Sequence, residues 1–325
     1  MSEGGAAAQD QALSPDGRRF VRQEGSYPTT GPLTVRDTTT GDVLVELRGT
    51  CTWDASITGE EAASQPGCDE PPYVFWAGEL SWSPDGSKIV GIDGAGLGGL
   101  FVWDSTTGEV MFHHPLAASS AIFTPDGQEV LVATDDDLFA PEDDAVHVVR
   151  FDVDSGAQRA NASIDVYFPD FIGFSADGST VYIVDQPSSF DSGTLLALSA
   201  SGVEVLRSRE RVSDGSVKAS GMNGDGSQIV TGSSDGFVRI WDAATFDLVH
   251  EIFIGETQVQ GAAFVNDTQV AIAPEEGNIY VMTIDRDELL AVVRSSLTRG
   301  FSEAECERFN FGSDCPTLEE LQSGS

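Results

Sequence analysis

The sequence predicts an all-β fold made of small antiparallel sheets, and three observations support this prediction. A turn signal recurs along the chain, with its aspartates Asp85, Asp126, Asp177 and Asp225 separated by 41, 51 and 48 residues. Short apolar runs flank each turn, as expected for strands joined by tight hairpins. No amphipathic helix of the length that a parallel sheet requires is indicated before residue 285.

The recurring signal is a four-residue turn in which each residue type has a conformational role. Proline presets the first turn position, aspartate accepts hydrogen bonds from its own backbone, and glycine takes the position with positive φ. Apolar runs before and after the turn, such as residues 80–82 and 89–90, predict the first two strands of each repeat. The copies are Ser14-Pro15-Asp16-Gly17, Ser83-Pro84-Asp85-Gly86, Thr124-Pro125-Asp126-Gly127, Ser175-Ala176-Asp177-Gly178 and Asn223-Gly224-Asp225-Gly226, with a shortened copy at Asn266-Asp267.

A third strand in each repeat is predicted to end at a second recurring dipeptide. Its clearest copies are Trp103-Asp104 and Trp241-Asp242, and weaker copies are Arg36-Asp37, Phe151-Asp152, Leu198-Ser199 and Met282-Thr283. A second turn and a fourth strand follow, for example at residues 37–41 and 43–47. Four short strands in about 40–45 residues are typical of a β-propeller blade. Because one blade cannot cover both faces of its sheet, the repeats must pack side by side.

The predicted fold is therefore a β-propeller of six to seven four-stranded antiparallel blades with a short helical C-terminal tail. With these motifs in place, residues 10–285 resemble the WD40 repeat family through the combination of S-P-D-G, G-x-x-x-x-W-D and D-x-x-T-G. The resemblance implies a toroid of typically seven blades that serves as a platform for interactions. Six repeats are present here, which leaves three alternatives: a six-bladed ring, a partial seventh blade built from the termini, or a fragment of a longer protein.

Several residues are expected to have structural roles. Trp103 and Trp241 should pack between neighbouring blades, and Asp104 and Asp242 should anchor the turns that follow. The same holds for the first-turn aspartates Asp85, Asp126, Asp177 and Asp225, and Asp235 stands where the WD40 family has its tight-turn aspartate. The family often braces the tryptophan with a histidine that follows a glycine. None of the four histidines, His113, His114, His147 and His250, follows a glycine, so the complete brace is missing.

Four regions are predicted along the chain: a disordered N-terminus at 1–10, the propeller at 11–285, an insert at 50–73 in its first blade, and a helical tail at 286–325. The tail contains three capping-box signals, which begin at Asp285, Ser302 and Thr317. Its sequence resembles the tails that close WD40 propellers at the C-terminus of large bacterial multidomain regulators. The resemblance implies a sensing or docking role beside an upstream regulatory module.

The charge and the cysteine content limit the classes of binding partner and the cellular compartments that are expected. The 53 acidic and 17 basic residues give a net charge of −36, which excludes sequence-independent binding to nucleic acid and favours basic partners. No apolar stretch is long enough for insertion in a membrane, and we expect a monomer. Two short-loop disulfides, Cys51–Cys68 and Cys306–Cys315, fit the cysteine spacing. The expected location is cytoplasmic, or extracytoplasmic if the cysteines pair.

No catalytic constellation or cofactor motif is present, so we expect no catalytic residues, no cofactor and no enzymatic activity. One weak metal candidate is an acidic loop, whose carboxylates are of the type that binds Ca²⁺ but lack the alternating spacing of a calcium loop. The residues of this loop are Asp135, Asp136, Asp137, Glu142, Asp143 and Asp144.

Two functions remain from the sequence. The first is a non-catalytic scaffold for protein–protein interaction in a bacterial regulatory system, with the insert at 50–73 as the preferred contact element. The alternative is a propeller that binds a small molecule or Ca²⁺ through carboxylates converging on its central channel, with hydrolase activity as an option.

Overall fold

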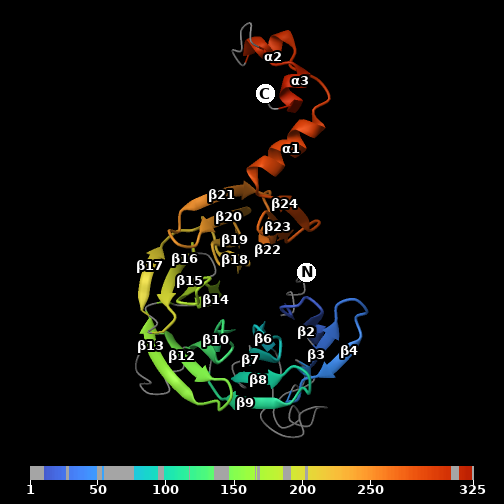
Figure 1. The fold of residues 1–325 in the computed structure, drawn as a ribbon. Coiled ribbons are helices and arrows are strands. Elements are labelled where there is room, and N and C mark those ends of the chain that lie inside the picture. The colour runs from blue at the N-terminus through green and yellow to red at the C-terminus, as the bar shows by residue number, and fades with distance from the viewer. Residues whose placement is uncertain are drawn as a thin grey trace. The chain divides into compact units, whose positions relative to one another are not determined.

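Strands account for most of the structure, a computed structural model that describes residues 11–26, 29–49, 53–54, 77–93, 99–116, 118–134, 146–164, 166, 169–185, 192–201, 204–308 and 315–323. In this part of the chain, twenty-four strands form six antiparallel sheets and three helices follow them (Figure 1). Two compact units divide the chain, with β1–β17 in the first and nearly all of β18–β24 in the second.

The first unit contains four sheets, and in each of them consecutive strands are hydrogen-bonded neighbours. The first sheet has β1 (Gln11–Leu13), β2 (Arg19–Ser26), β3 (Thr29–Asp37) and β4 (Val43–Glu46), with β5 (Trp53–Asp54) paired to β3. The second has β6 (Ala77–Trp82), β7 (Lys88–Asp93), β8 (Leu100–Asp104) and β9 (Val110–His114). The third has β10 (Ala118–Phe123), β11 (Glu129–Thr134), β12 (Val146–Asp152) and β13 (Gln158–Ile164). The fourth has β14 (Pro169–Phe174), β15 (Thr180–Asp185), β16 (Thr194–Ser199) and β17 (Val205–Arg209).

The second unit contains two sheets and the helices. Its first sheet has β18 (Val217–Met222), β19 (Gln228–Ser233), β20 (Phe237–Asp242) and β21 (Leu248–Phe253). Its second sheet has three strands among the described residues, β22 (Val259–Asn266), β23 (Gln269–Pro274) and β24 (Tyr280–Thr283). Where the other sheets continue into a fourth strand, the chain here continues into helix α1 (Arg286–Ser296).

The recurring turns lie where the sequence predicts them, between the first and second strands. In the first four copies the glycine N–H donates to the carbonyl of the first turn residue at 2.8 Å. The glycines adopt φ values from +67° to +70°, which only glycine reaches without strain. The second predicted turn joins the third and fourth strands, which end and begin around Asp104 and Glu109 in the second sheet.

The hydrophobic core lies between neighbouring sheets. One cluster joins Val21 and Val35 of the first sheet to Ile89, Phe101 and Trp103 of the second. Similar clusters join the second sheet to the third, the third to the fourth, and the two sheets of the second unit. Within each unit, each sheet therefore covers the apolar face of the next one, as the repeat argument predicts.

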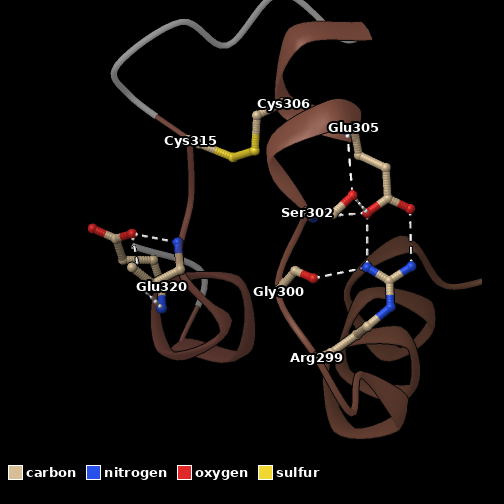
Figure 2. Close-up of a disulfide and its surroundings, with 8 residues drawn as sticks. Arg299, Gly300, Ser302, Glu305, Cys306, Cys315 and Glu320 are labelled. Carbon is tan, nitrogen blue, oxygen red and sulfur yellow. Dashed lines mark hydrogen bonds and ion pairs between the residues drawn. A yellow bond between two sulfur atoms is a disulfide. The ribbon is translucent and has the colours of Figure 1, made fainter.

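The tail forms α1, α2 (Glu303–Arg308) and α3 (Leu318–Ser323), each started by a predicted capping box. The Glu288 N–H donates to Asp285 at 2.7 Å, and the Ser302 N–H donates to Glu305 at 2.8 Å. Figure 2 shows the disulfide between Cys306 and Cys315, one of the two pairings that fit the cysteine spacing. Cys51 and Cys68 lie outside the described residues. None of the described helices is long and apolar enough to cross a membrane.

Candidate functional site

The two turns of each sheet in the first unit meet at the same end of the strands. In the second sheet the Ser105 N–H donates to the Ser87 carbonyl at 2.9 Å, and the third sheet has the same bond from Val153 to Gln128. These turns form what we call the turn surface. It consists of residues 14–19, 83–88, 124–129 and 175–180 from the first turns, with 37–42, 104–109, 152–157 and 199–201 from the second turns.

Consecutive first turns also contact one another. A Cβ placed on Gly127 would lie 3.6 Å from Pro84 Cδ, and one on Gly178 would lie 3.3 Å from Pro125 Cγ. The proline of each turn thus lies against the glycine of the next one. Neighbouring first turns of the first unit are therefore close-packed at the turn surface.

The turns hydrogen-bond the ionised form of the first-turn aspartates. The hydroxyls of Ser83 and Ser175 donate to Asp85 and Asp177 at 2.7 Å, and backbone N–H groups donate as well. These bonds lower the pKa of Asp85 and of Asp177 to about 2. The pKa of Asp126 is also lowered, first by the Thr124 hydroxyl and then by the Gln128 N–H. All three carboxylates are exposed and ionised at neutral pH.

A groove of about 350 Å³ lies on this surface between the first turns of the third and fourth sheets. Asp126 of the third sheet and Asp177 of the fourth both line the groove, and so do Arg150 and Glu129, which form an ion pair. Arg150 also donates from Nη1 to the Ser201 carbonyl at 2.9 Å. Its Nε is buried and has no hydrogen-bond partner in the described structure.

A second polar cluster joins the first strands of three consecutive sheets. Ala121 N–H in β10 donates to Glu79 of β6 at 3.3 Å, and the Phe171 N–H in β14 donates to the Ser120 hydroxyl at 3.0 Å. Ser120 in turn donates to Asp170 at 3.4 Å, and Asp170 is also hydrogen-bonded to Glu79. Glu79 has φ +23° at a register shift of β6, and such a bulge re-aims a side chain.

Burial raises the pKa of Asp170, and its hydrogen bonds to Glu79 and Ser120 only partly offset this effect. Asp170 therefore binds a proton more readily in the folded chain than in the unfolded one. The carboxyl groups of Glu79 and Asp170 provide too few oxygens for Ca²⁺, which takes six to eight. The described residues contain no group of three or more His, Cys, Asp or Glu side chains that could hold a metal ion.

Replacing Asp170 by asparagine should raise Tm at pH 7, because the amide carries no charge to desolvate. Since the folded-state pKa of Asp170 is raised, its contribution to stability falls as pH rises through that pKa, and the gain should shrink toward about pH 4. Asp85→Asn provides the opposite sign. It should lose stability at pH 7 and approach the wild type only as pH falls toward the folded pKa of about 2. Calorimetry between pH 2 and pH 7 measures the Tm of both variants. A Tm of Asp170→Asn below that of the wild type at pH 7 would contradict the claim that burial destabilises the charged form of Asp170.

The two predicted tryptophans are buried, but they use their indole groups differently. Trp103 Nε1 donates to the Arg48 carbonyl of the first sheet at 2.8 Å. Trp241 Nε1 donates to Thr231 of its own sheet at 3.0 Å. Asp104 and Asp242 accept N–H groups of their second turns, at 2.9 Å from Thr106 N and 2.8 Å from Thr245 N.

Asp235 lies in a buried network that the sequence did not reveal. It accepts hydrogen bonds from the Ser233 hydroxyl, from the Phe237 N–H at 3.1 Å, and from Arg239 at 2.8 Å. Arg239 is 7% exposed and also pairs with Glu251 at 2.8 Å. The Arg239 guanidinium thus binds the Asp235 carboxylate, which a histidine would contact in the complete WD40 brace.

The remaining candidates lie apart from one another or outside the described residues. His113 packs against Phe101, and His114 packs against Phe151 and bonds the Gly156 carbonyl at 2.6 Å. His147 lies in β12 and His250 in β21. The acidic loop of Asp135, Asp136, Asp137, Glu142, Asp143 and Asp144 lies outside the described residues, and so does the insert at 50–73 apart from Trp53 and Asp54.

Comparison with known proteins identifies the fold. The sequence matches no protein-family profile and no curated protein. The structure is similar to the crystal structure of the C-terminal WD40 domain of Sif2, with a TM-score of 0.58 over 86% of this chain and 67% of that one. The two sequences are 15% identical, so this likeness concerns the fold. The fold is a six-bladed β-propeller like that of this WD40 domain, which confirms the predicted fold class.

Proposed function

We propose that the protein is a non-catalytic docking scaffold whose turn surface binds basic segments of other proteins. The observation that carries this proposal is the groove between the third and fourth sheets. Its two rim carboxylates, Asp126 and Asp177, keep their charge at neutral pH and stand on turns that are stacked and hydrogen-bonded in place.

The groove suits a segment that brings a cation. A lysine or arginine side chain would lie against Asp126 and Asp177, which both line the groove. Because the aspartates are already oriented by their own turns, binding would cost little reorganisation of the protein. The net charge of −36 adds long-range attraction for basic partners, and this attraction weakens as salt is added.

Neutralising the groove aspartates should weaken the binding of a lysine- and arginine-rich peptide about three- to tenfold, since each exposed charge pair is worth about 0.2–1 kcal/mol. The variant is Asp126→Asn with Asp177→Asn, measured by fluorescence anisotropy at low and at physiological salt. The matched control is Asp16→Asn with Asp225→Asn, which removes the same charge from the same turn motif outside the groove. Equal weakening in both double variants would overturn the groove as the docking site.

We further propose that the scaffold belongs to a bacterial regulatory system and acts as its sensor or docking module. Support comes from the C-terminal tail, whose sequence resembles the tails of propellers in large bacterial regulators. The partner in such a system would be an upstream regulatory module, either on the same polypeptide or in the same complex.

The alternative of a ligand-binding propeller is supported by one observation, the paired carboxyl groups of Glu79 and Asp170 on the first strands of the second and fourth sheets. We place it second because a carboxyl group that favours its proton is a poor ligand for a hard cation. Thermal stability with Ca²⁺ and with EDTA discriminates the two functions, because a cation held only by the folded chain raises Tm.

A further inference from the structure

The last strand of the sixth sheet is exposed although it stands where the other sheets have a buried strand. Gln269 pairs with Thr283 and Val270 with Met282, in the same register in which Gln228 pairs with Asp242 and Ile229 with Trp241 in the neighbouring sheet. Ile240 and Trp241 are 0% and 2% exposed, whereas Val281 and Met282 are 59% and 36% exposed. Ile240 is covered by side chains of the sixth sheet. β20 is also paired with a fourth strand, and no fourth strand lies beside β24 in the described structure.

The outer edge of β24 therefore offers backbone groups beside apolar side chains. In the neighbouring sheet, β21 pairs antiparallel with β20 through Val238 to Ile252 and Ile240 to His250. Beside β24, helix α1 does not replace such a strand. The Glu288 carboxylate accepts from the Thr283 hydroxyl at 2.9 Å, which ties the first turn of α1 to the end of the strand. Figure 1 shows β24 as the last strand before α1.

The charge of the sequence that leads to β24 points to a basic occupant. Between Arg239 and Arg286 the chain contains no Lys or Arg, but it contains eight acidic residues. These residues are Asp242, Asp247, Glu251, Glu256, Asp267, Glu275, Glu276 and Asp285. A second copy of this chain, with its own net charge of −36, would be repelled. The N-terminal sequence MSEGGAAAQD is acidic and lacks the β-branched and aromatic residues that favour strands.

We propose that an extended, basic segment of a partner protein completes the sixth sheet by pairing antiparallel with β24. The backbone of the segment supplies the missing ladder of hydrogen bonds. Its apolar side chains cover Tyr280 and Met282, which share one face of the strand, and its lysine or arginine side chains lie on the face of Val281. The edge of β24 lies in the second unit and the groove lies in the first. Failure of one of these two proposed binding sites therefore does not imply failure of the other.

The test uses the full chain and a peptide of about eight residues that alternates lysine with valine, the length of a typical strand. The control peptide has the same sequence, but alternate backbone nitrogens are methylated. It keeps the charge and the side chains but cannot form the ladder of hydrogen bonds. We expect the methylated peptide to bind about tenfold more weakly. Hydrogen exchange should show protection of the β24 amides by the unmodified peptide only.

Two single substitutions that add the same charge at different strands test whether the peptide binds at β24. Val281→Lys places a cation on the exposed face of β24 and should abolish binding. Val249→Lys makes the same change on β21, where the residue is 41% exposed, and should leave binding within about twofold. Equal binding by both peptides, or equal loss in both variants, overturns the proposal.

Two further outcomes identify a different occupant and also overturn it. If deleting residues 1–10 strengthens peptide binding about tenfold, the chain's own N-terminus covers β24. If light scattering shows a dimer that Val281→Lys dissociates, a second copy is the occupant.

Discussion

Replacing Trp103 by alanine should lower the free energy of unfolding by about 3–5 kcal/mol, the usual cost of removing a large buried side chain. Trp103 is fully buried and belongs to the cluster that joins the first and second sheets. Its ring stacks on Phe101 with 5.3 Å between centroids, and its Nε1 bonds the Arg48 carbonyl of the first sheet. The variant loses packing inside its own sheet and a contact to the preceding one. Tm should fall by roughly 10 °C in a thermal melt.

Trp103→Phe separates the two contributions. It keeps most of the aromatic contact but removes the donor to Arg48, so its loss of stability should fall between those of the wild type and the alanine variant, with about 1 kcal/mol from the hydrogen bond. A Tm for Trp103→Ala equal to that of the wild type would contradict the position of this side chain between two sheets.

Local signals account for what could be predicted. The turns with aspartate and glycine have strong conformational preferences of their own, and the alternating apolar runs beside them specify strands. The number of repeats, the place of Trp103 and Trp241 at the end of third strands, and the capping boxes of the tail all follow from short stretches of sequence. The prediction of four strands per repeat holds for five sheets. In the last sheet, the sequence from Asp285 onward forms a helix instead.

Contacts between repeats could not be predicted, because they join residues far apart in the chain. Glu79, Ser120 and Asp170 come together through three different sheets, and a bulge in β6 sets the direction of Glu79. The groove depends in the same way on the stacking of Pro125 against Gly178. The pattern along a single strand does not indicate these contacts between sheets. The one unusual local feature is an acidic residue, Glu79 or Asp170, within a first strand that should be half-buried.

Replacing Asp235 by alanine should destabilise the protein by about 3 kcal/mol, because it leaves the buried Arg239 with one carboxylate instead of two. Arg239 is 7% exposed, and Glu251, the partner that remains, is 43% exposed at its side chain. Glu251→Ala should cost less, about 1 kcal/mol, because that carboxylate is already well solvated. Chemical denaturation of the three proteins gives the order of stability directly.

The double variant Asp235→Ala with Arg239→Met tests whether these two charges depend on each other. Methionine can follow the path of the arginine stem without a charge to satisfy, and exchanging a buried ion pair for apolar side chains is often neutral. We therefore expect the double variant to be more stable than Asp235→Ala alone, with a coupling energy of about 2 kcal/mol. If the two single losses simply add, Asp235 does not compensate the buried guanidinium, and the network around Ser233 is held by its hydroxyl and backbone bonds instead.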